Sequence, residues 1–388
     1  MVIKSYQPKS ILNVHKHIDG GWFWNKYSAF PYLGCQYGCQ YCYWRDEKYN
    51  PHKPSRDPEL LKFEDPFSQY IKIKKNAAQL LYKELSKQPK DLIYLDHYQP
   101  IEAKERLTRS MLQVCLDLDF PVFINEKSPL LLNDLDLLKE INKKTYLNVG
   151  WSIITTVDDK TWRIFEPRAH SVRARFEAME KLSSQGILTG TVFMPILPFV
   201  YDNKENIENV IRRTKVCGGQ YVLEGGLTLW GYCGTHFYKA LEEYKPSLLT
   251  KYKRLYDKRN LWQMHMAKVH SMVQKYCREY NLRDHIPRHV NFFPTHLQYN
   301  KKLAGVLFVQ AREIQLSNKP AYKFWALQKA ARAIDGLDRD IKEIYKEEGE
   351  KGLLAIKGIG ERLAKTITEL LEAGEHGENG STSEPIRI

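Results

Sequence analysis

The sequence predicts an α/β protein: a parallel strand–helix barrel that stops at six units, followed by a small all-α domain. Apolar segments of strand length alternate with helical patterns of about ten to fifteen residues, an order typical of parallel βα units. A loop with three cysteines precedes this series, and residues 301–375 carry a helical pattern with a Gly-Ile-Gly turn. The alternation, the loop and the turn define the two domains that we expect.

Each strand expected in the barrel is a short apolar run next to a longer amphipathic segment. In the first expected helix, Ile71, Ile73, Ala77 and Leu81 fall on one apolar face. Six units suit an incomplete (β/α)6 barrel better than a closed barrel of eight. After a first strand directly before the cysteines, we expect strands at 91–95, 120–124, 147–153, 188–195 and 221–227, and helices at 68–88, 103–118, 131–143, 171–185 and 204–216.

The chain length fits one large domain and one smaller domain. The sequence has 388 residues, more than a single hydrophobic core usually serves. We assign residues 1–300 to the first domain, including a basic helical extension at 245–290, and residues 301–375 to the second. Residues 376–388 are rich in Gly, Ser and Glu, and we expect them to be disordered.

The distribution of charge points to a polyanionic partner. The chain carries a formal net charge of +13, and the segment Lys245–Arg288 contains eleven Lys and Arg residues against three Asp and Glu. Tyr252, Tyr256 and Trp262 lie among these charges, and aromatic rings beside cations suit phosphates and splayed bases. The same charges are also consistent with a solvated helix face.

Cysteine usage and hydropathy predict a cytoplasmic protein. Seven cysteines, an odd number, give no disulfide framework, and reduced thiols are typical of the cytosol. The sequence has no apolar segment of signal-peptide or membrane-span length, so we expect no membrane partner. Cys115, Cys217 and Cys277 fall on helical patterns, and we expect them in the core.

The loop with three cysteines is the clearest chemical signal in the chain. Cys35, Cys39 and Cys42 form a C-x3-C-x2-C spacing, with Tyr41 directly before the last cysteine. Three thiolates hold three irons of a [4Fe–4S] cubane and leave the fourth iron open to a substrate. The other interpretations are a redox dithiol, buried core cysteines, or a structural zinc site. A zinc site needs a fourth ligand, which His15, His17 or His52 offers.

Polar residues follow the expected strands at the edge where parallel βα folds hold their ligands. Asp96 and Tyr98 follow one strand, Lys127 follows the next, and Ser152 ends the third. The segment from Gly225 to Cys233 follows the last expected strand. A single residue at such a position can simply cap a helix, but together these residues outline the mouth of a pocket.

These segments together resemble the spore photoproduct lyase-like branch of the radical S-adenosylmethionine (SAM) superfamily, over roughly residues 10–240. The resemblance implies a radical SAM barrel, in which a [4Fe–4S] cluster and SAM form a 5′-deoxyadenosyl radical with electrons from an external donor. It implies that Lys127 pairs with the SAM carboxylate and that Ser152 hydrogen-bonds to SAM; we expect Tyr41 and Asp96 in the same cofactor pocket. The matching stretches are residues 31–35, 96–102, 127–129, 165–168, 194–198 and 225–229.

One departure from this branch concerns the hydrogen donor. Authentic lyases of the branch carry a donor cysteine near the end of the strand that here leads into Asp96, and this sequence has no cysteine there. We expect Cys233, after the last strand, or Tyr98 to take this catalytic role. For Cys233 the alternative is a buried structural role in a glycine-rich loop.

The second domain resembles a helix-hairpin-helix module. The turn that contains Gly358 and Gly360 lets backbone N–H groups at a helix start approach a phosphate. Arg362 and Lys365 follow on the helix as expected phosphate partners. Such contacts fix a protein on a duplex without reading its sequence. A hairpin that docks another protein is the alternative.

The helix upstream of this hairpin, residues 318–334, extends the resemblance to the small DNA-binding domain of family X DNA polymerases. The resemblance implies a phosphate contact by Lys323. Thr366 stands where that family has its Schiff-base lysine, so we expect no lyase activity from this domain.

These features predict a radical enzyme that acts on duplex DNA, in repair of a lesion or in modification of a base. A damaged base suits such an enzyme because a lesion lowers the cost of flipping a base out of the duplex. An RNA-modifying radical SAM enzyme is the alternative within the enzyme class. A non-catalytic iron–sulfur protein that binds nucleic acid or senses redox state is the alternative outside it.

Overall fold

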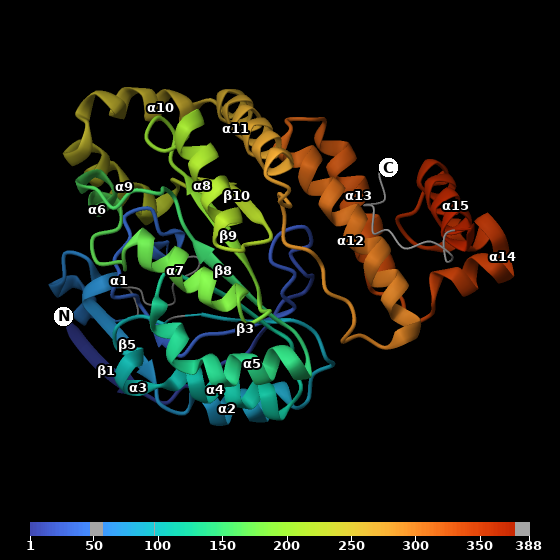
Figure 1. Cartoon of the computed structure of the whole chain (residues 1–388), viewed down its shortest axis with the longest axis horizontal. Coiled ribbons are helices and arrows are strands. Elements are labelled where there is room, and N and C mark those ends of the chain that lie inside the picture. The colour runs from blue at the N-terminus through green and yellow to red at the C-terminus, as the bar shows by residue number, and fades with distance from the viewer. Residues whose placement is uncertain (47–56, 97, 377–388) are drawn as a thin grey trace. The chain divides into compact units, whose positions relative to one another are not determined.

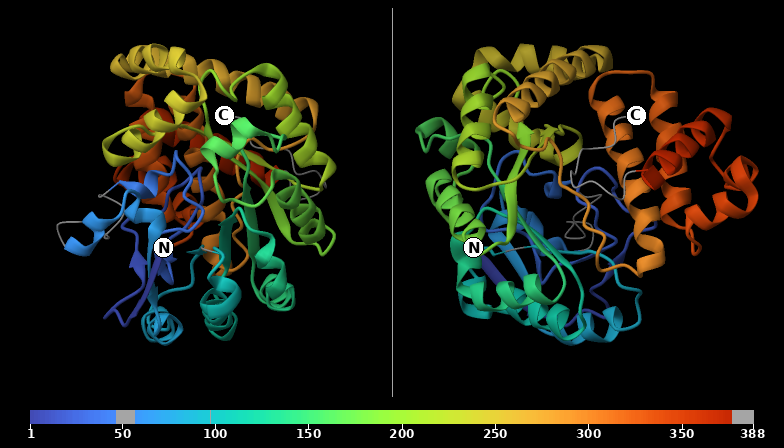
Figure 2. Two further views of the ribbon diagram at one scale, coloured as in Figure 1. Left: turned by 90° about the vertical axis from the view of Figure 1, so that its left-hand side faces the viewer. Right: turned by 45° about the vertical axis from the view of Figure 1, so that its right-hand side comes forward.

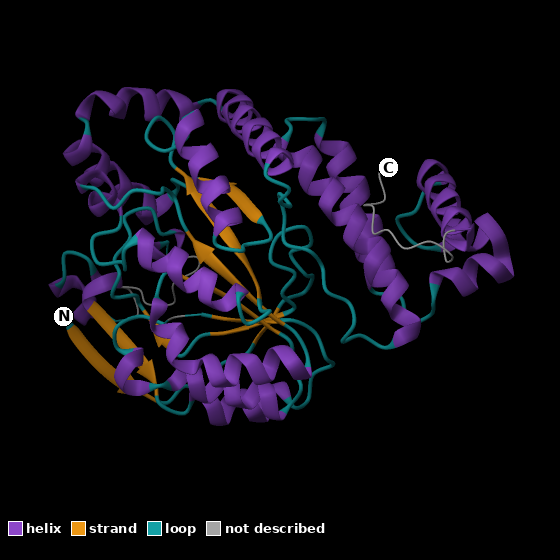
Figure 3. Ribbon diagram, viewed as in Figure 1, coloured by secondary structure: helices purple, strands orange, loops and turns teal. Residues whose placement is uncertain are grey.

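The structure is a computed structural model that describes residues 1–46, 57–96 and 98–376 (Figure 1). Strands and helices alternate as far as Gly226, and from there the described chain forms helices (Figure 3). This order confirms the predicted fold class, an α/β parallel sheet followed by a helical region. The tail predicted to be disordered, residues 376–388, lies outside the described residues apart from His376.

The chain forms two compact units. Unit 1 comprises Met1–Ile18 and Asn25–Pro287, and unit 2 comprises Asp19–Trp24 and the chain from Arg288 onward. Unit 2 therefore begins before residue 300, where the sequence analysis puts the boundary, because the long helix that starts at Thr295 packs with the helices that follow it. A short N-terminal segment joins this unit as well, which sequence patterns did not predict.

The main sheet of unit 1 has seven strands within the described chain, in the order β10-β9-β8-β7-β6-β3-β2. From β3 to β10 neighbouring strands are parallel, and β2 is antiparallel to β3. These six parallel strands of the described residues match the predicted six units. As far as the structure describes the chain, β2 and β10 do not pair with each other, so the barrel stays open. The strands are β2 (Asn13–Val14), β3 (Tyr27–Ala29), β6 (Ile93–Leu95), β7 (Val122–Glu126), β8 (Leu147–Ser152), β9 (Leu188–Ile196) and β10 (Val222–Gly226).

The sheet register aligns the carboxyl ends of the central strands. Leu95 lies opposite Ile124, and Ile124 lies opposite Val149. All three side chains are buried, as expected for parallel strands that are covered on both faces. Side chains that follow β6, β7 and β8 in sequence therefore emerge along one edge, where the polar residues predicted to form a site are found.

Helices connect the strands and cover the sheet (Figures 1 and 2). α2, α4 and α5 pack side by side, and α8 packs against α11. Cys115, Cys217 and Cys277 are buried, as predicted. No helix of the described chain is both long enough and apolar enough to span a bilayer. The helices of unit 1 are α1 (Pro66–Gln69), α2 (Ala77–Leu85), α3 (Glu102–Glu105), α4 (Leu107–Asp117), α5 (Leu135–Lys144), α6 (Lys160–Phe165), α7 (Val172–Ser183), α8 (Lys204–Val216), α9 (Gly231–Tyr244), α10 (Leu249–Asp257) and α11 (Arg259–Glu279), with 3-10 turns η1 (Tyr43–Arg45), η2 (Pro58–Lys62), η3 (Pro129–Asp134) and η4 (Pro246–Leu248).

The helix predicted over residues 68–88 is wrong in its first half. Residues Tyr70–Lys74 form strand β5, which pairs with β1 (Val2–Tyr6) and β4 (Tyr32–Leu33) in a second, three-stranded sheet. Ile71 and Ile73 are buried in this strand, whereas Lys72 and Lys74 are only half-buried. This period of two is typical of a strand, and only α2 keeps the helical period.

Unit 2 consists of helices and the segment Asp19–Trp24 in the part of it that the structure describes. α12 (Thr295–Leu316) packs along α13 (Ala321–Asp335), and α14 (Ile341–Ala355) packs on α15 (Glu361–His376). The N-terminal segment packs on α12: the ring centroids of Trp24 and Phe308 are 6.0 Å apart. The guanidinium of Arg312 lies 4.7 Å from the ring centroid of Trp22.

Candidate active site and nucleic-acid interface

The three-cysteine loop runs from β4 to η1 as a series of tight turns. Gly34 has φ +81, and a β-carbon there would lie 2.7 Å from the carbonyl oxygen of Phe67, so the loop requires glycine at this point. The N–H of Gly38 donates to the carbonyl of Cys35, and the N–H of Cys42 donates to that of Cys39, both at 3.3 Å. These turns gather the three thiols in one short segment.

The three thiols form an electrostatically coupled and largely buried group. Burial raises the pKa of Cys35, of Cys42 and of Cys39, the last to about 12; the charges of Cys39 and Cys42 also raise the pKa of Cys35, and that of Cys42 raises the pKa of Cys39. All three are free of disulfides. Three such thiols on one loop fit the ligand set of a [4Fe–4S] cluster, whose iron binds them as thiolates.

The zinc interpretation finds less support among the expected fourth ligands. The ring Nε2 of His15 lies 3.0 Å from the hydroxyl of Ser28, to which it is hydrogen-bonded, and burial lowers the pKa of this histidine. His52 lies outside the described residues. The residues that surround the thiols instead include an ammonium group, Lys127, whose charge acts on Cys39 and Cys42.

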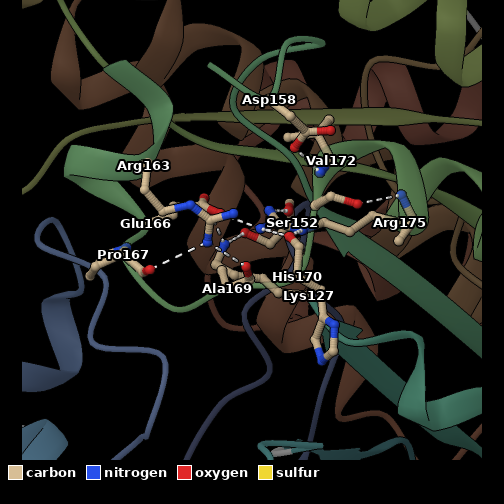
Figure 4. A network of polar contacts seen from close by, with 12 residues as sticks. Lys127, Ser152, Asp158, Arg163, Glu166, Pro167, Ala169, His170, Val172 and Arg175 are labelled. Carbon is tan, nitrogen blue, oxygen red and sulfur yellow. Dashed lines mark hydrogen bonds and ion pairs between the residues drawn. The ribbon is translucent and has the colours of Figure 1, made fainter. Parts of the chain in front are cut away.

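Lys127, Ser152 and Tyr41, which the sequence predicts in the cofactor pocket, lie together. Lys127 follows β7, and its ammonium group donates to the hydroxyl of Ser152, the last residue of β8 (Figure 4). The same ammonium nitrogen lies 5.5 Å from the ring centroid of Tyr41. The side chain of Lys127 is 15% exposed, so its charge remains open to a ligand at the strand ends.

A buried carboxylate, Glu166, connects these residues; the sequence analysis places it in a matching stretch but gives it no role in the site. Glu166 follows α6 and accepts hydrogen bonds from the hydroxyl of Tyr41 and from the guanidinium of Arg175 (Figure 4). Its Oε1 lies 3.5 Å from the ammonium nitrogen of Lys127. Arg175 also donates to the carbonyl of Ser152 at 2.8 Å. A charged residue among the apolar positions of α7 was the signal that could have revealed Arg175.

The charges of this network favour an anionic ligand. Burial raises the pKa of Glu166, but Arg175 and Lys127 outweigh it and hold the pKa at about 2. Glu166 is therefore ionised at neutral pH, and it faces two cations. The network of Lys127, Arg175 and Glu166 keeps one uncompensated positive charge, which suits a carboxylate such as that of SAM.

Asp96 lies at the same edge, beside the cysteines. Its Oδ2 accepts a hydrogen bond from the hydroxyl of Tyr94 at 2.7 Å, and its charge raises the pKa values of Cys35 and Cys42. The neighbouring Glu126 accepts from the backbone N–H of Lys127 at 3.0 Å. Burial, together with the charge of Asp96, raises the pKa of Glu126 to about 8. Glu126 is a second residue that sequence reasoning missed, although it directly precedes Lys127.

The two residues predicted as hydrogen donors differ in their surroundings. Cys233 is buried in α9, its thiol donates to the carbonyl of Trp230 at 2.7 Å, and burial raises its pKa to about 11. α9 packs on η1, the turn that directly follows Cys42, so Cys233 lies on an element next to the three-cysteine loop. The hydroxyl of Tyr98 is instead bonded to Asp134 on η3 at 2.9 Å.

In unit 2, four of the five residues predicted to bind phosphate lie in the turn between α14 and α15 and in the first turns of α15. Gly358 has φ +110, and a β-carbon there would lie 3.0 Å from Cγ of Lys329, so the turn requires glycine. Gly360 is exposed and directly precedes α15. Arg362 and Lys365 are exposed on this helix, and Lys323 is exposed near the start of α13.

The predicted aromatic surface of the basic extension is wrong in part. Tyr252 is buried, and its hydroxyl bonds to the carbonyl of Pro198, while the hydroxyl of Tyr256 bonds to the carbonyl of Leu227 at 2.8 Å. These rings belong to the core, and the lysines between them form a solvated face. Exposed rings beside a lysine occur instead on α13, where Tyr322 is 69% and Trp325 is 60% exposed.

Comparison with known families gives two matches. The model of the Radical SAM superfamily matches residues 30–213. The model of a helix-hairpin-helix domain matches residues 298–376. The first match contains the cysteine loop, Lys127, Ser152, Glu166 and Arg175, and the second contains the turn at Gly358.

Two relatives and one solved structure illustrate what the chain is similar to. An uncharacterised protein of Methanocaldococcus jannaschii is 30% identical over 238 residues, 60% of this chain and 78% of that protein. An uncharacterised protein of Acidianus two-tailed virus is 26% identical over 269 residues, 64% of this chain and 84% of that protein. A solved mutant spore photoproduct lyase with a dinucleoside spore photoproduct is 13% identical, with a TM-score of 0.47 over 72% of this chain and 79% of that chain.

Proposed function

Because the chain belongs to the radical SAM superfamily and ends in a helix-hairpin-helix domain, we propose that it is a radical SAM enzyme that acts on DNA. The reaction that we propose is lyase-like repair of a pyrimidine photolesion in a duplex, or modification of a normal base. The observation that carries this proposal is the convergence of three thiols with Lys127 and Ser152 at one sheet edge, in a chain that also carries a helix-hairpin-helix domain.

The residues of unit 1 divide into those that hold the cluster and those that hold SAM. Cys35, Cys39 and Cys42 are the iron ligands, and the cluster, when bound with SAM, supplies a 5′-deoxyadenosyl radical after reduction by an external donor. Lys127 binds the SAM carboxylate, since the network around it has one unbalanced positive charge. Ser152 would donate to the same ligand, and Tyr41 and Asp96 would line its pocket.

Cys233 is the residue that we propose as hydrogen donor. Its support is its place on α9, which packs on η1, the turn that directly follows Cys42. The Tyr98 hydroxyl is held by the carboxylate of Asp134, a stronger hydrogen bond than that of the Cys233 thiol to a carbonyl, because S–H is a weak donor. In the proposed step the S–H bond of Cys233 breaks and a C–H bond forms on the substrate radical. The sulfur radical is then reduced and protonated, with its electron from the external donor. In deuterated water, a product made through Cys233 should carry deuterium, and Cys233→Ala should remove this label, whereas Cys217→Ala should retain it.

The hairpin of unit 2 is the proposed grip on DNA phosphates. Gly360 and the side chains of Arg362, Lys365 and Lys323 are exposed, and Gly358 is half-buried. Binding through phosphates predicts an affinity that falls with salt and does not depend on base sequence. Lys365→Ala should lower the slope of log affinity against log salt by about one unit, whereas Lys346→Ala, an exposed lysine of α14, should leave it unchanged.

The proposed activity is tested with anaerobically reconstituted protein, SAM and a low-potential reductant. Ultraviolet-irradiated duplex DNA, intact duplex DNA and tRNA are incubated in parallel, and 5′-deoxyadenosine and the nucleosides are measured by mass spectrometry. We expect cleavage of SAM and altered nucleosides in DNA. Cys39→Ala should abolish both signals, and Cys115→Ala, which changes a buried cysteine of α4, should keep them.

Two outcomes would contradict the proposal. Altered nucleosides in tRNA alone would identify the enzyme as one that modifies RNA. A protein that holds its full iron content and binds SAM, but cleaves none of it with any reductant, would be a non-catalytic iron–sulfur protein.

A further inference from the structure

Arg45 is a buried cation beside the cysteine loop that the proposed chemistry does not yet use. It is the third residue after Cys42 and lies in η1, and its side chain is fully buried. Lys and Arg are almost never fully buried without a partner, since removing a charge from water is costly. The position of Arg45 therefore needs a physical reason.

Three of the interactions of Arg45 are visible in the structure. Its Nε donates to the carbonyl of Cys39 at 2.9 Å, and its Nη1 pairs with Asp65 at 2.5 Å. The guanidinium carbon lies 5.1 Å from the ring centroid of Phe67. The other oxygen of Asp65 accepts from the hydroxyl of Ser68 at 2.5 Å. Arg45 is thus held rigidly against the loop that carries the cluster ligands.

The remaining nitrogen of Arg45 lacks a partner. Nη2 is buried and has no hydrogen-bond partner among the described residues. A buried N–H group without an acceptor costs about 1–3 kcal/mol, and more when it belongs to a charged group. In native proteins such a group commonly meets a ligand or an ion that supplies the acceptor.

The charge of Arg45 is fixed against the segment that carries the cluster ligands. Its Nε is hydrogen-bonded to the carbonyl of Cys39 itself, and Arg45 lies in the 3-10 turn that directly follows Cys42. Hydrogen bonds to sulfur and nearby charges are the means by which proteins set the reduction potential of an iron–sulfur cluster. A cation that is fixed near the ligands stabilises the reduced cluster, because reduction adds one negative charge.

We propose that Arg45 is a positioning residue for the cluster, with Nη2–H directed to the sulfur of the bound cluster or its thiolates and a charge that raises the reduction potential. The step that it favours is the transfer of one electron from a low-potential external donor to the oxidised cluster. No bond to substrate is made or broken in this step. The inference rests on the cluster of the proposed function but not on its DNA substrate.

The test is the reduction potential of the cluster in the reconstituted protein. Electron paramagnetic resonance measures the fraction of reduced cluster in solutions that are held at a series of known potentials. Arg45→Met removes the charge but keeps much of the side-chain volume. At a potential where the native cluster is half reduced, we expect the ratio of oxidised to reduced cluster to rise about tenfold, equivalent to about 59 mV for one electron. Arg45→Lys, which keeps the charge, should shift the ratio less, and Arg173→Met, on the exposed face of α7, should not shift it.

A second variant covers the case in which Arg45→Met fails to fold or to bind iron. Asp65→Asn removes the counter-charge and leaves Arg45 in place, so it should shift the ratio in the opposite direction. An unchanged potential in Arg45→Met with full iron content would overturn the inference, and so would an unchanged or lowered potential in Asp65→Asn. Loss of iron from the native protein would instead contradict the proposed function.

Discussion

Glu166 should contribute strongly to the stability of unit 1, because it is a fully buried carboxylate that faces two cations. The change that tests this is Glu166→Gln, which keeps the shape of the side chain and removes its charge. Arg175 would then be a fully buried guanidinium without a counter-charge, since Glu166 is its carboxylate partner in the structure. Lys127 would lose its closest carboxylate as well.

Two independent estimates agree on how much Glu166→Gln lowers the free energy of unfolding. Breaking a buried ion pair by removal of one partner costs about 3–5 kcal/mol. The pKa of Glu166 is about 2 in the folded protein, against an ordinary value of 4.5, and at about 1.4 kcal/mol per unit this difference corresponds to about 3 kcal/mol. We therefore expect Glu166→Gln to lower the free energy of unfolding by about 3–5 kcal/mol at pH 7.

The contribution of Glu166 to the free energy of unfolding should depend on pH in a definite direction. The pKa of Glu166 is lower in the folded than in the unfolded chain, so its contribution is fully present above about pH 4.5 and is lost as the pH falls towards 2. Urea unfolding, with near-ultraviolet circular dichroism as the probe, measures the free energy of unfolding across this pH range. The Gln variant should lose the part of the pH dependence that belongs to Glu166.

Control variants separate this ion pair from an effect of charge in general. Glu177→Gln removes the partner of Arg173 in an exposed pair of α7, 3.5 Å apart, and should cost less than about 1 kcal/mol. Glu166→Leu combined with Arg175→Met should cost clearly less than the sum of the two single changes. A loss below about 1 kcal/mol in Glu166→Gln, or strict additivity in the double variant, would refute the reasoning.

Three further predictions follow from the site, the hairpin and a buried carboxyl. Lys127→Met should weaken SAM binding at least about tenfold in equilibrium dialysis, because it removes one charge-assisted hydrogen bond; unchanged affinity would remove Lys127 from the site. Gly358→Val should destabilise unit 2 by about 1–3 kcal/mol and weaken duplex binding, because φ is +110 at this position and a β-carbon would lie 3.0 Å from Lys329. Fluorescence anisotropy with a labelled duplex measures the binding, and unchanged affinity would contradict a role of this turn in DNA binding. Burial raises the pKa of Glu102 to about 7, so stability should fall as the pH rises from about 4.5 through 7; Glu102→Gln should flatten this slope, and an unaltered slope would contradict the assignment.

The parallel sheet could be predicted because its strands are buried on both faces. Val122, Phe123 and Ile124 form an uninterrupted apolar run in the sequence and are all buried in β7. The position of Lys127 and Ser152 followed from the same reasoning, since parallel strands end at one edge of the sheet. Local sequence is sufficient for both conclusions.

Features that depend on contacts distant in sequence could not be predicted. Glu166 and Arg175 meet only after α6 and α7 have packed; the apolar pattern of α7 marks Arg175 as a buried cation, but it does not name the partner. Ile71 and Ile73 fit the face of a helix as well as that of a strand, and β1 and β4 decide in favour of the strand. Tyr252 lies among lysines in sequence, but packing turns its ring into the core.

The segment Asp19–Trp24 has a consequence for the design of fragments and for the order of synthesis. The chain passes from one unit to the other at three points, after Ile18, after Trp24 and after Pro287. A C-terminal fragment that starts at Arg288 would therefore lack the residues that cover Phe308, and it would be a poor substitute for the intact unit in binding studies. On the ribosome, Asp19–Trp24 emerges long before α12, so unit 2 can be completed only after unit 1 has been made.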